Sequence, residues 1–172
     1  VRVCAADGAF RYFGMTKNDV STVRDRLLRA FWAGMTRVLG MPISTRLACL
    51  LQTRIQGFDA AISFLHSGGA HTFYGGCNAF VLNCVDAEKK ITYLHCDYGQ
   101  IRAASAYNAD LYQRFDEIVA CSDGCRRAFL NAHPQLTGKT CVIPNFQNDA
   151  AIVRLAKAQP VNLDHGRLNV LT

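Results

Sequence analysis

The chain has 172 residues, of which 50% are hydrophobic and 19% are charged, a balance typical of one globular domain and not of a disordered protein. Its apolar runs are shorter than the roughly 18–20 residues of a membrane-spanning helix, so we expect no membrane span. The net charge of +6 comes from residues 1–58, which carry nine Lys or Arg against three Asp, whereas residues 59–172 carry ten against ten. An anionic partner of that segment and a merely solvated basic helix explain this asymmetry equally well.

The basic first third is predicted to hold two helices. Apolar residues recur at helical spacing from Val20 to Leu39, with arginines between them, and Gly40 and Pro42 end this pattern. A second helix is expected from Ser44, a candidate N-cap, to Ile55, where Gly57 stops it.

Short, almost continuous apolar runs then alternate with helical patterns. The strands are predicted at Asp59–Leu65, Lys90–His95, Asp116–Cys121 and Lys139–Ile143, and the helices between them at Thr72–Val85, Ala104–Arg114 and Ser122–His133. Continuous apolar strands are typical of a sheet that is covered by helices on both faces. We therefore predict an α/β fold with a doubly wound, Rossmann-like parallel sheet.

The C-terminal end differs from this core. Asp149–Gln159 reads as a short helix, Pro160–Gly166 as a linker and Arg167–Thr172 as the beginning of another strand. We expect residues 1–160 to form one Rossmann-like domain, with a basic helical part (1–57), a strand–helix core (58–146) and a hinge helix (147–160). Residues 161–172 would be a linker and the start of a second domain, so we expect a chain that is truncated at both ends.

The eight cysteines show no CxxC pair, and so neither zinc-binding nor redox spacing. Most simply they are reduced thiols of a cytoplasmic protein, some of them buried in strands. Cys121 and Cys125 are four residues apart, but the sequence assigns them no chemistry.

Ligands of doubly wound folds bind beyond the carboxyl ends of the strands, where free helix N–H groups point into a crevice. Gly68 and Gly69 follow the first strand, either to let a ligand approach the backbone or as part of a flexible turn. His95, Asp97 and Tyr98 follow the second strand and are the best local indication of a site.

The third and fourth strand ends have simpler explanations. Ser122 and Asp123 follow the third strand, where helix capping alone would account for both residues. Asn145 follows Pro144 at the fourth, most simply in a turn.

Several known motifs are absent. Thr137–Thr140 contains GKT, but His133 stands where a phosphate-binding loop has its first glycine, and the segment precedes a strand instead of following one. The chain also has no GxGxxG, GxSxG or HExxH. Basic residues beside Phe31 and Trp32 match no nucleic-acid-binding signature, so no nucleic-acid partner is expected.

Taken in order, four segments resemble the N-terminal domain of the two-domain, GT-B type glycosyltransferases of the large retaining family 4. They are FDAAISFL, KKITYLHCDY, FDEIVACSDGCRRAFLNAHPQLTGKTCVIPNF and RLNVLT. The similarity covers about residues 58–172, whereas residues 1–57 match nothing sharply. Two features depart from the family: its first strand with a glycine-containing loop is not found, and PNF replaces the commoner PNG.

The resemblance implies transfer of a sugar, with retention of configuration, from a nucleotide-sugar donor to a glycan or lipid-linked acceptor in polysaccharide biosynthesis. It implies no cofactor and no essential metal. A missing C-terminal domain would bind most of the donor, so this chain alone is expected to be inactive.

The resemblance also assigns residues to roles. His95 corresponds to the histidine that faces the transferred sugar and Asp97 to an acidic position beside it, both expected to be catalytic. Ser122 and Asp123 match a pair at the helix start beside the cleft, and Asn145 matches a residue at the hinge entry.

Two further expectations concern partners. The basic helix 20–39 is a candidate contact with an anionic membrane surface, which would place the protein in the cytoplasm at the inner face of the membrane. The alternative function is that of a non-catalytic α/β domain that binds a small anionic ligand at the same strand ends.

Overall fold

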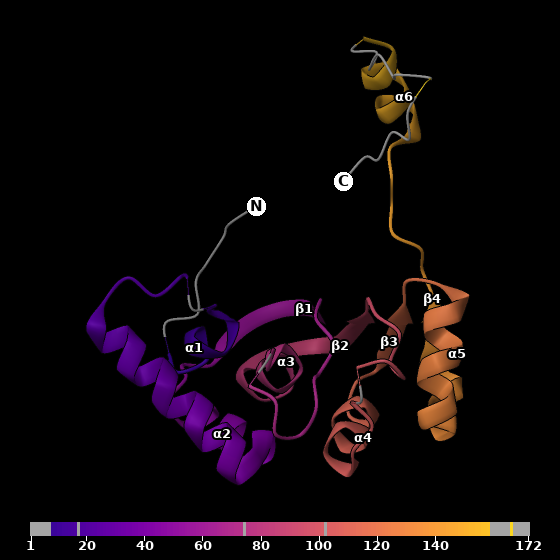
Figure 1. The fold of residues 1–172 in the computed structure, drawn as a ribbon. Coiled ribbons are helices and arrows are strands. Elements are labelled where there is room, and N and C mark those ends of the chain that lie inside the picture. Colours follow the sequence, from indigo (N-terminus) through magenta and orange to yellow (C-terminus); the bar gives the residue numbers. More distant parts are fainter. Residues whose placement is uncertain (1–7, 17, 74, 102, 159–165, 167–172) are drawn as a thin grey trace.

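The computed structural model describes residues 8–16, 18–73, 75–101, 103–158 and 166. Its centre is a sheet in the order β1-β2-β3-β4, built from β1 (Ile55–Ser63), β2 (Val85–Leu94), β3 (Glu117–Ala120) and β4 (Thr140–Val142) (Figure 1). All neighbouring strands are parallel, and the register pairs Ile62 with Ile91 and Leu94 with Ala120. The predicted α/β class and parallel sheet are therefore confirmed.

The first third contains a four-residue helix, α1 (Arg11–Gly14), that the sequence did not predict, and the long helix α2 (Val23–Leu50). The predicted break in α2 is confirmed, because Gly40 has φ 83° and ψ 166° and divides it into two helical halves. The predicted cap at Ser44 is wrong: this residue lies inside the second half, and its hydroxyl donates to the Gly40 carbonyl at 2.8 Å.

Three helices connect the strands: α3 (Cys77–Cys84), α4 (Ala106–Gln113) and α5 (Asp123–Ala132), with the 3₁₀ helix η1 (Pro134–Lys139) after α5. Their apolar side chains form one core with the inner face of the sheet; its members include Ala61, Leu94, Ile118, Leu82, Tyr112 and Phe129. A single cluster means that all three helices cover the same face. Right-handed crossovers produce this result when each new strand is added beyond the last.

The other face of the sheet is open among the described residues. Ile62 lies between buried Ala61 and Ser63 and is itself exposed, as are Phe64 and Ile143. The second helical layer that a doubly wound sheet needs is thus not seen in this part of the chain. The continuous apolar runs predicted that layer; in the structure Val119 of β3 is buried on this face, whereas Ile62 and Ile143 are left exposed.

Two strands begin earlier than the sequence indicates. β1 starts at Ile55, which was expected to end a helix, and β2 starts at Val85 instead of Lys90. Asp86, Glu88 and Lys89 are polar and exposed, so this half of the strand lacks the apolar run that marks a buried strand. As a result α3 is shorter than predicted and begins at Cys77.

The last described helix is α6 (Asp149–Ala158), which matches the predicted helix and has no buried residues. The predicted linker and strand after Pro160 lie, apart from Gly166, outside the described residues. Throughout the described part of the chain, no helix is both long enough and apolar enough to cross a bilayer.

Candidate functional site

The carboxyl ends of β1, β2 and β3 lie at one edge of the sheet, because Ser63 pairs with Thr92 and Leu94 with Ala120. The segments that follow these strands begin at Phe64, His95 and Cys121. The structure therefore brings the candidates from three separate segments to one edge, which we call the carboxyl rim. Parallel α/β sheets place their ligands at this edge.

His95 is half-buried against two aromatic rings. Its imidazole lies 4.3 Å from the Phe64 ring and 5.4 Å from the Tyr93 ring, measured between centroids, and stacks on Tyr93. Nε2 of His95 is buried and has no hydrogen-bond partner among the described residues. Leaving such an atom unsatisfied costs about 1–3 kcal/mol. Phe64 is 62% exposed, so displacing its ring would open His95 to a hydrogen-bonding ligand.

Asp97 and Tyr98 follow His95 but point to different surroundings. Asp97 is exposed, and its Oδ1 accepts a hydrogen bond from the Gly99 N–H at 2.9 Å within a tight turn. Tyr98 is only 1% exposed, and its hydroxyl donates to the Ala103 carbonyl at 3.1 Å and lies 3.0 Å from His133 Nε2. Burial raises the pKa of Tyr98. Tyr98, predicted to bind substrate, is therefore a core residue whose hydroxyl is engaged by protein groups.

The loop after β1 is held from below by buried polar side chains. The Ser67 N–H donates to the Tyr112 hydroxyl at 3.1 Å, and Asn78 Nδ2 donates to Ser67 Oγ at 2.9 Å. Asn108 Nδ2 donates to the Gly68 carbonyl at 2.8 Å. Hydrogen bonds in such a low-dielectric interior fix their partners, so the loop that carries Gly68 and Gly69 is held in position and is not the flexible turn of the alternative interpretation.

The kink in α2 supports the same loop from the side. The Met41 N–H donates to the Ala70 carbonyl at 2.6 Å, and His71 Nδ1 lies 3.3 Å from the Arg37 carbonyl. A Cβ atom on Gly40 would lie 3.3 Å from the Ala70 carbonyl oxygen, in a backbone conformation that favours glycine. The basic helix is thus physically joined to the carboxyl rim.

Ser122 and Asp123 form the start of α5. Ser122 Oγ accepts a hydrogen bond from the Cys125 N–H at 3.2 Å, so the predicted cap is confirmed, and Asp123 lies in the first turn. Both side chains are exposed at the rim, beside free N–H groups of the helix. Asn145 is also exposed, beyond the end of β4.

One further residue of the rim was not among the predicted site residues. His66 follows β1, and burial, followed by repulsion from His95, lowers its pKa. The two imidazoles therefore lie near each other at neighbouring strand ends. The signal was present in the sequence as a histidine that directly follows an apolar strand.

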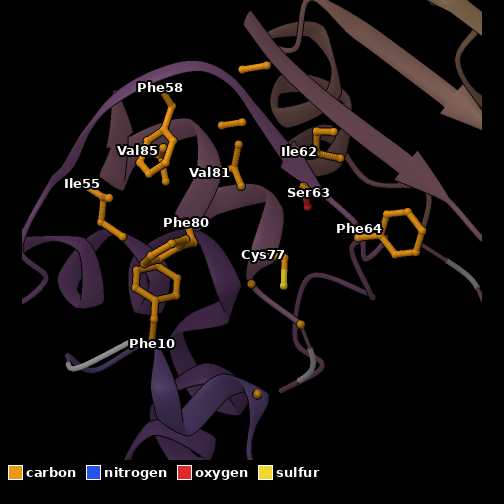
Figure 2. A pocket seen from close by; sticks show the side chains of 15 residues that line it. Phe10, Ile55, Phe58, Ile62, Ser63, Phe64, Cys77, Phe80, Val81 and Val85 are labelled. Atoms are coloured by element: carbon orange, nitrogen blue, oxygen red, sulfur yellow. The ribbon is translucent and has the colours of Figure 1, made fainter. Parts of the chain in front are cut away.

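A separate apolar cavity of about 540 Å³ runs along β1 (Figure 2). Phe10 and Phe80 close one side of it with an edge-to-face ring contact at 5.2 Å, and Phe58 and Ile62 of β1 also line it. Phe64 lines this cavity as well and so connects it with His95. None of the predicted site residues belongs to its lining.

No group of three or more His, Cys, Asp or Glu side chains within the described ranges is arranged to hold a metal ion. Comparison of the chain with protein-family models, curated proteins and solved structures found no match.

Proposed function

We propose that the chain is the acceptor-side domain of a retaining GT-B type glycosyltransferase, which moves a sugar from a nucleotide-sugar donor to a glycan or lipid-linked acceptor. The observation that carries the proposal is the carboxyl rim. The fixed loop at Gly68, the imidazole of His95 and the N-terminus of α5 follow three consecutive parallel strands there.

The incomplete covering of the sheet supports the proposal that further chain completes a larger fold. β1 is an edge strand, yet it carries exposed Phe58 and Ile62 and borders the apolar cavity. Apolar side chains on an edge strand and on an open sheet face favour an additional strand and a second helical layer. A complete GT-B enzyme would supply both, together with a second domain that binds the nucleotide.

Each group at the rim has a definite part in the proposed transfer. His95 Nε2 would hydrogen-bond the transferred sugar once Phe64 has moved, and in doing so would regain the partner that it lacks. The N–H groups at the start of α5 would stabilise negative charge, and Ser122 would contact a sugar hydroxyl. Asp97 would orient the acceptor. Tyr98 has no part, because its hydroxyl belongs to the core.

The decisive assay uses the protein translated from its reading frame as continued past Thr172. We expect it to release a nucleoside diphosphate from one member of a panel of uridine and guanosine diphosphate sugars in the presence of acceptor. His95→Ala should lower turnover about 100-fold or more while leaving the unfolding midpoint nearly unchanged. Gln113→Ala, a change in an exposed side chain at the C-terminal end of α4, should keep the wild-type turnover.

Two results would contradict the proposal: a continued reading frame that encodes no second α/β domain, or full turnover in His95→Ala. The alternative, a non-catalytic domain for small anions, predicts a different outcome. The 172-residue chain alone would then bind inorganic phosphate at the rim, and no sugar would be transferred.

We also propose that α2 rests on an anionic membrane surface beside the acceptor. Its first half exposes apolar residues at intervals that place them along one stripe, each more than half exposed: Val23, Leu27, Phe31 and Val38. Exposed arginines flank this stripe at positions 24, 26 and 37. An apolar stripe between arginines fits the boundary between acyl chains and anionic headgroups.

Flotation with vesicles tests this contact. The chain should float with phosphatidylglycerol-containing vesicles and not with pure phosphatidylcholine, and Leu27→Ser should weaken flotation. Ile152→Ser on α6, also an exposed apolar position, should leave it unchanged. A chain that stays in solution with both vesicle types would overturn the membrane contact without affecting the proposed transferase.

A further inference from the structure

Two cysteine side chains also lie at the carboxyl rim. Cys121 follows β3, Cys125 lies in the first turn of α5, and their Sγ atoms are 3.5 Å apart. Both residues are partly exposed free thiols. Cys121 precedes α5 and Cys125 lies within it, and the chain turns at the Ser122 cap so that the two side chains come into contact.

From this contact we infer that Cys121 and Cys125 are a reversible redox pair, which hydroperoxides oxidise to a disulfide that closes over the start of α5. The inference is independent of the proposed transferase, because it depends on the two thiols alone. A disulfide needs the sulfur atoms to approach to about 2.05 Å, which is a short movement from their observed separation.

The reaction balances as a two-electron oxidation. The Cys125 sulfur attacks the hydroperoxide, so that an S–O bond forms, the O–O bond breaks and the alcohol leaves with a proton. The Cys121 sulfur then attacks Cys125, an S–S bond forms, and the sulfenic oxygen leaves as water with the proton of Cys121. Two thiols and one hydroperoxide thus give one disulfide, one alcohol and one water.

The order of attack is assigned from the surroundings of Cys121. Burial first, and then the bond to Cys125, raise the pKa of Cys121. A raised pKa makes Cys121 the poorer nucleophile, so we assign Cys125, whose Sγ lies 3.5 Å away, as the attacking atom.

A third thiol nearby is a poorer participant. Cys96 follows β2 at the same rim, and burial raises its pKa to about 11, with smaller contributions from Cys125 and Cys121. A thiol that holds its proton so firmly reacts slowly with peroxide. The 3.5 Å contact between their sulfur atoms selects Cys121 and Cys125 from the three.

Oxidation would act directly on the rim. Ser122 and Asp123 lie between the two cysteines, and the Cys125 N–H is the donor to the Ser122 cap. Drawing the sulfur atoms together strains this turn, so the disulfide should shift the backbone signals of residues 121–126 and leave those of α4 in place. Because so few residues separate the two cysteines, the disulfide stabilises the fold little and should be readily reduced.

Trypsin isolates the pair, since cleavage after Arg114 and Arg126 leaves one peptide, residues 115–126, with these two cysteines and no other. The 172-residue chain is treated with an equimolar amount of hydrogen peroxide, alkylated with iodoacetamide and digested with trypsin. The masses of the peptides are then measured by mass spectrometry. We expect peptide 115–126 to lose the mass of two hydrogen atoms and to take no alkyl group. Dithiothreitol before alkylation should restore double alkylation.

Internal and variant controls make the result specific. Cys141, an exposed cysteine alone in peptide 140–154, should remain alkylated after the same treatment. Cys121→Ser and Cys125→Ser should each leave the remaining cysteine open to alkylation. The inference is overturned if both thiols stay alkylated in the wild-type chain, or if peptide 115–126 is instead linked through Cys96 to peptide 91–102.

Discussion

Removing the Tyr98 hydroxyl should destabilise the chain without affecting any ligand. The hydroxyl donates to the Ala103 carbonyl and, because that uses its hydrogen, accepts from His133 Nε2. In Tyr98→Phe the Ala103 carbonyl keeps the hydrogen bond that Asn108 Nδ2 donates at 2.7 Å. Only His133 is left unsatisfied, so we expect a loss of about 1–2 kcal/mol in the free energy of unfolding.

Thermal and urea unfolding followed by circular dichroism measure this loss. For a chain of this size, about 1–2 kcal/mol corresponds to a melting temperature lower by about 2–8 °C. Tyr93→Phe is the matched control. The substitution keeps the ring that stacks on His95, so we expect this variant to have a melting temperature close to that of the wild-type chain. The reasoning is refuted if Tyr98→Phe keeps the wild-type stability but impairs sugar transfer, since Tyr98 would then bind substrate, as its position after the second strand predicts.

Other consequences of the structure can be measured with the same unfolding assays. Gly40→Ala should cost about 1–3 kcal/mol, because a Cβ there meets the Ala70 carbonyl at a φ that favours glycine, whereas Gly34→Ala, with open space around it, should stabilise α2 by about 0.5–1 kcal/mol. Burial lowers the pKa of both His133 and His66, so the unfolded chain binds more protons than the folded chain near and below the ordinary histidine pKa. Stability should therefore fall as the pH is lowered from about 7.5 to about 5.5, and His133→Gln should reduce this slope; a flat profile in the wild-type chain would contradict the assignment.

Much of the sheet could be predicted because its signals are local. Short, mostly apolar runs mark β3, β4 and the second half of β2, and Gly40 with Pro42 marks the kink in α2. The cap at Ser122 could also be predicted, because an N-cap needs only a hydroxyl-bearing residue before a helical pattern. These features depend on a few neighbouring residues, and the fold did not alter them.

The remaining features depend on contacts between distant segments. Tyr98 looked like a site residue because it follows His95, but its surroundings come from Ala103 and from His133, which is 35 positions away along the chain. The spacing of Cys121 and Cys125 already places them one turn apart across a strand–helix junction, but their 3.5 Å contact depends on the chain turn at the start of α5. Pattern reading does not reveal the surroundings of Tyr98, because it contains no third dimension.

In the described part of the chain, the candidate site divides into a rim with an unpaired imidazole nitrogen and a support that is paired apart from Asn108 Oδ1. Beneath the loop, Thr92 Oγ1 donates to Asn78 Oδ1 at 2.9 Å, and Asn78 in turn donates to Ser67, so this buried chain of polar groups is paired from strand to loop. At the rim, His95 Nε2 has no such partner among the described residues. Because Asn78 is paired through both its amide nitrogen and its amide oxygen, the unpaired nitrogen of His95 at a strand end favours a ligand there. The support fixes where that ligand would sit, and the unpaired imidazole provides the free energy that binding would recover.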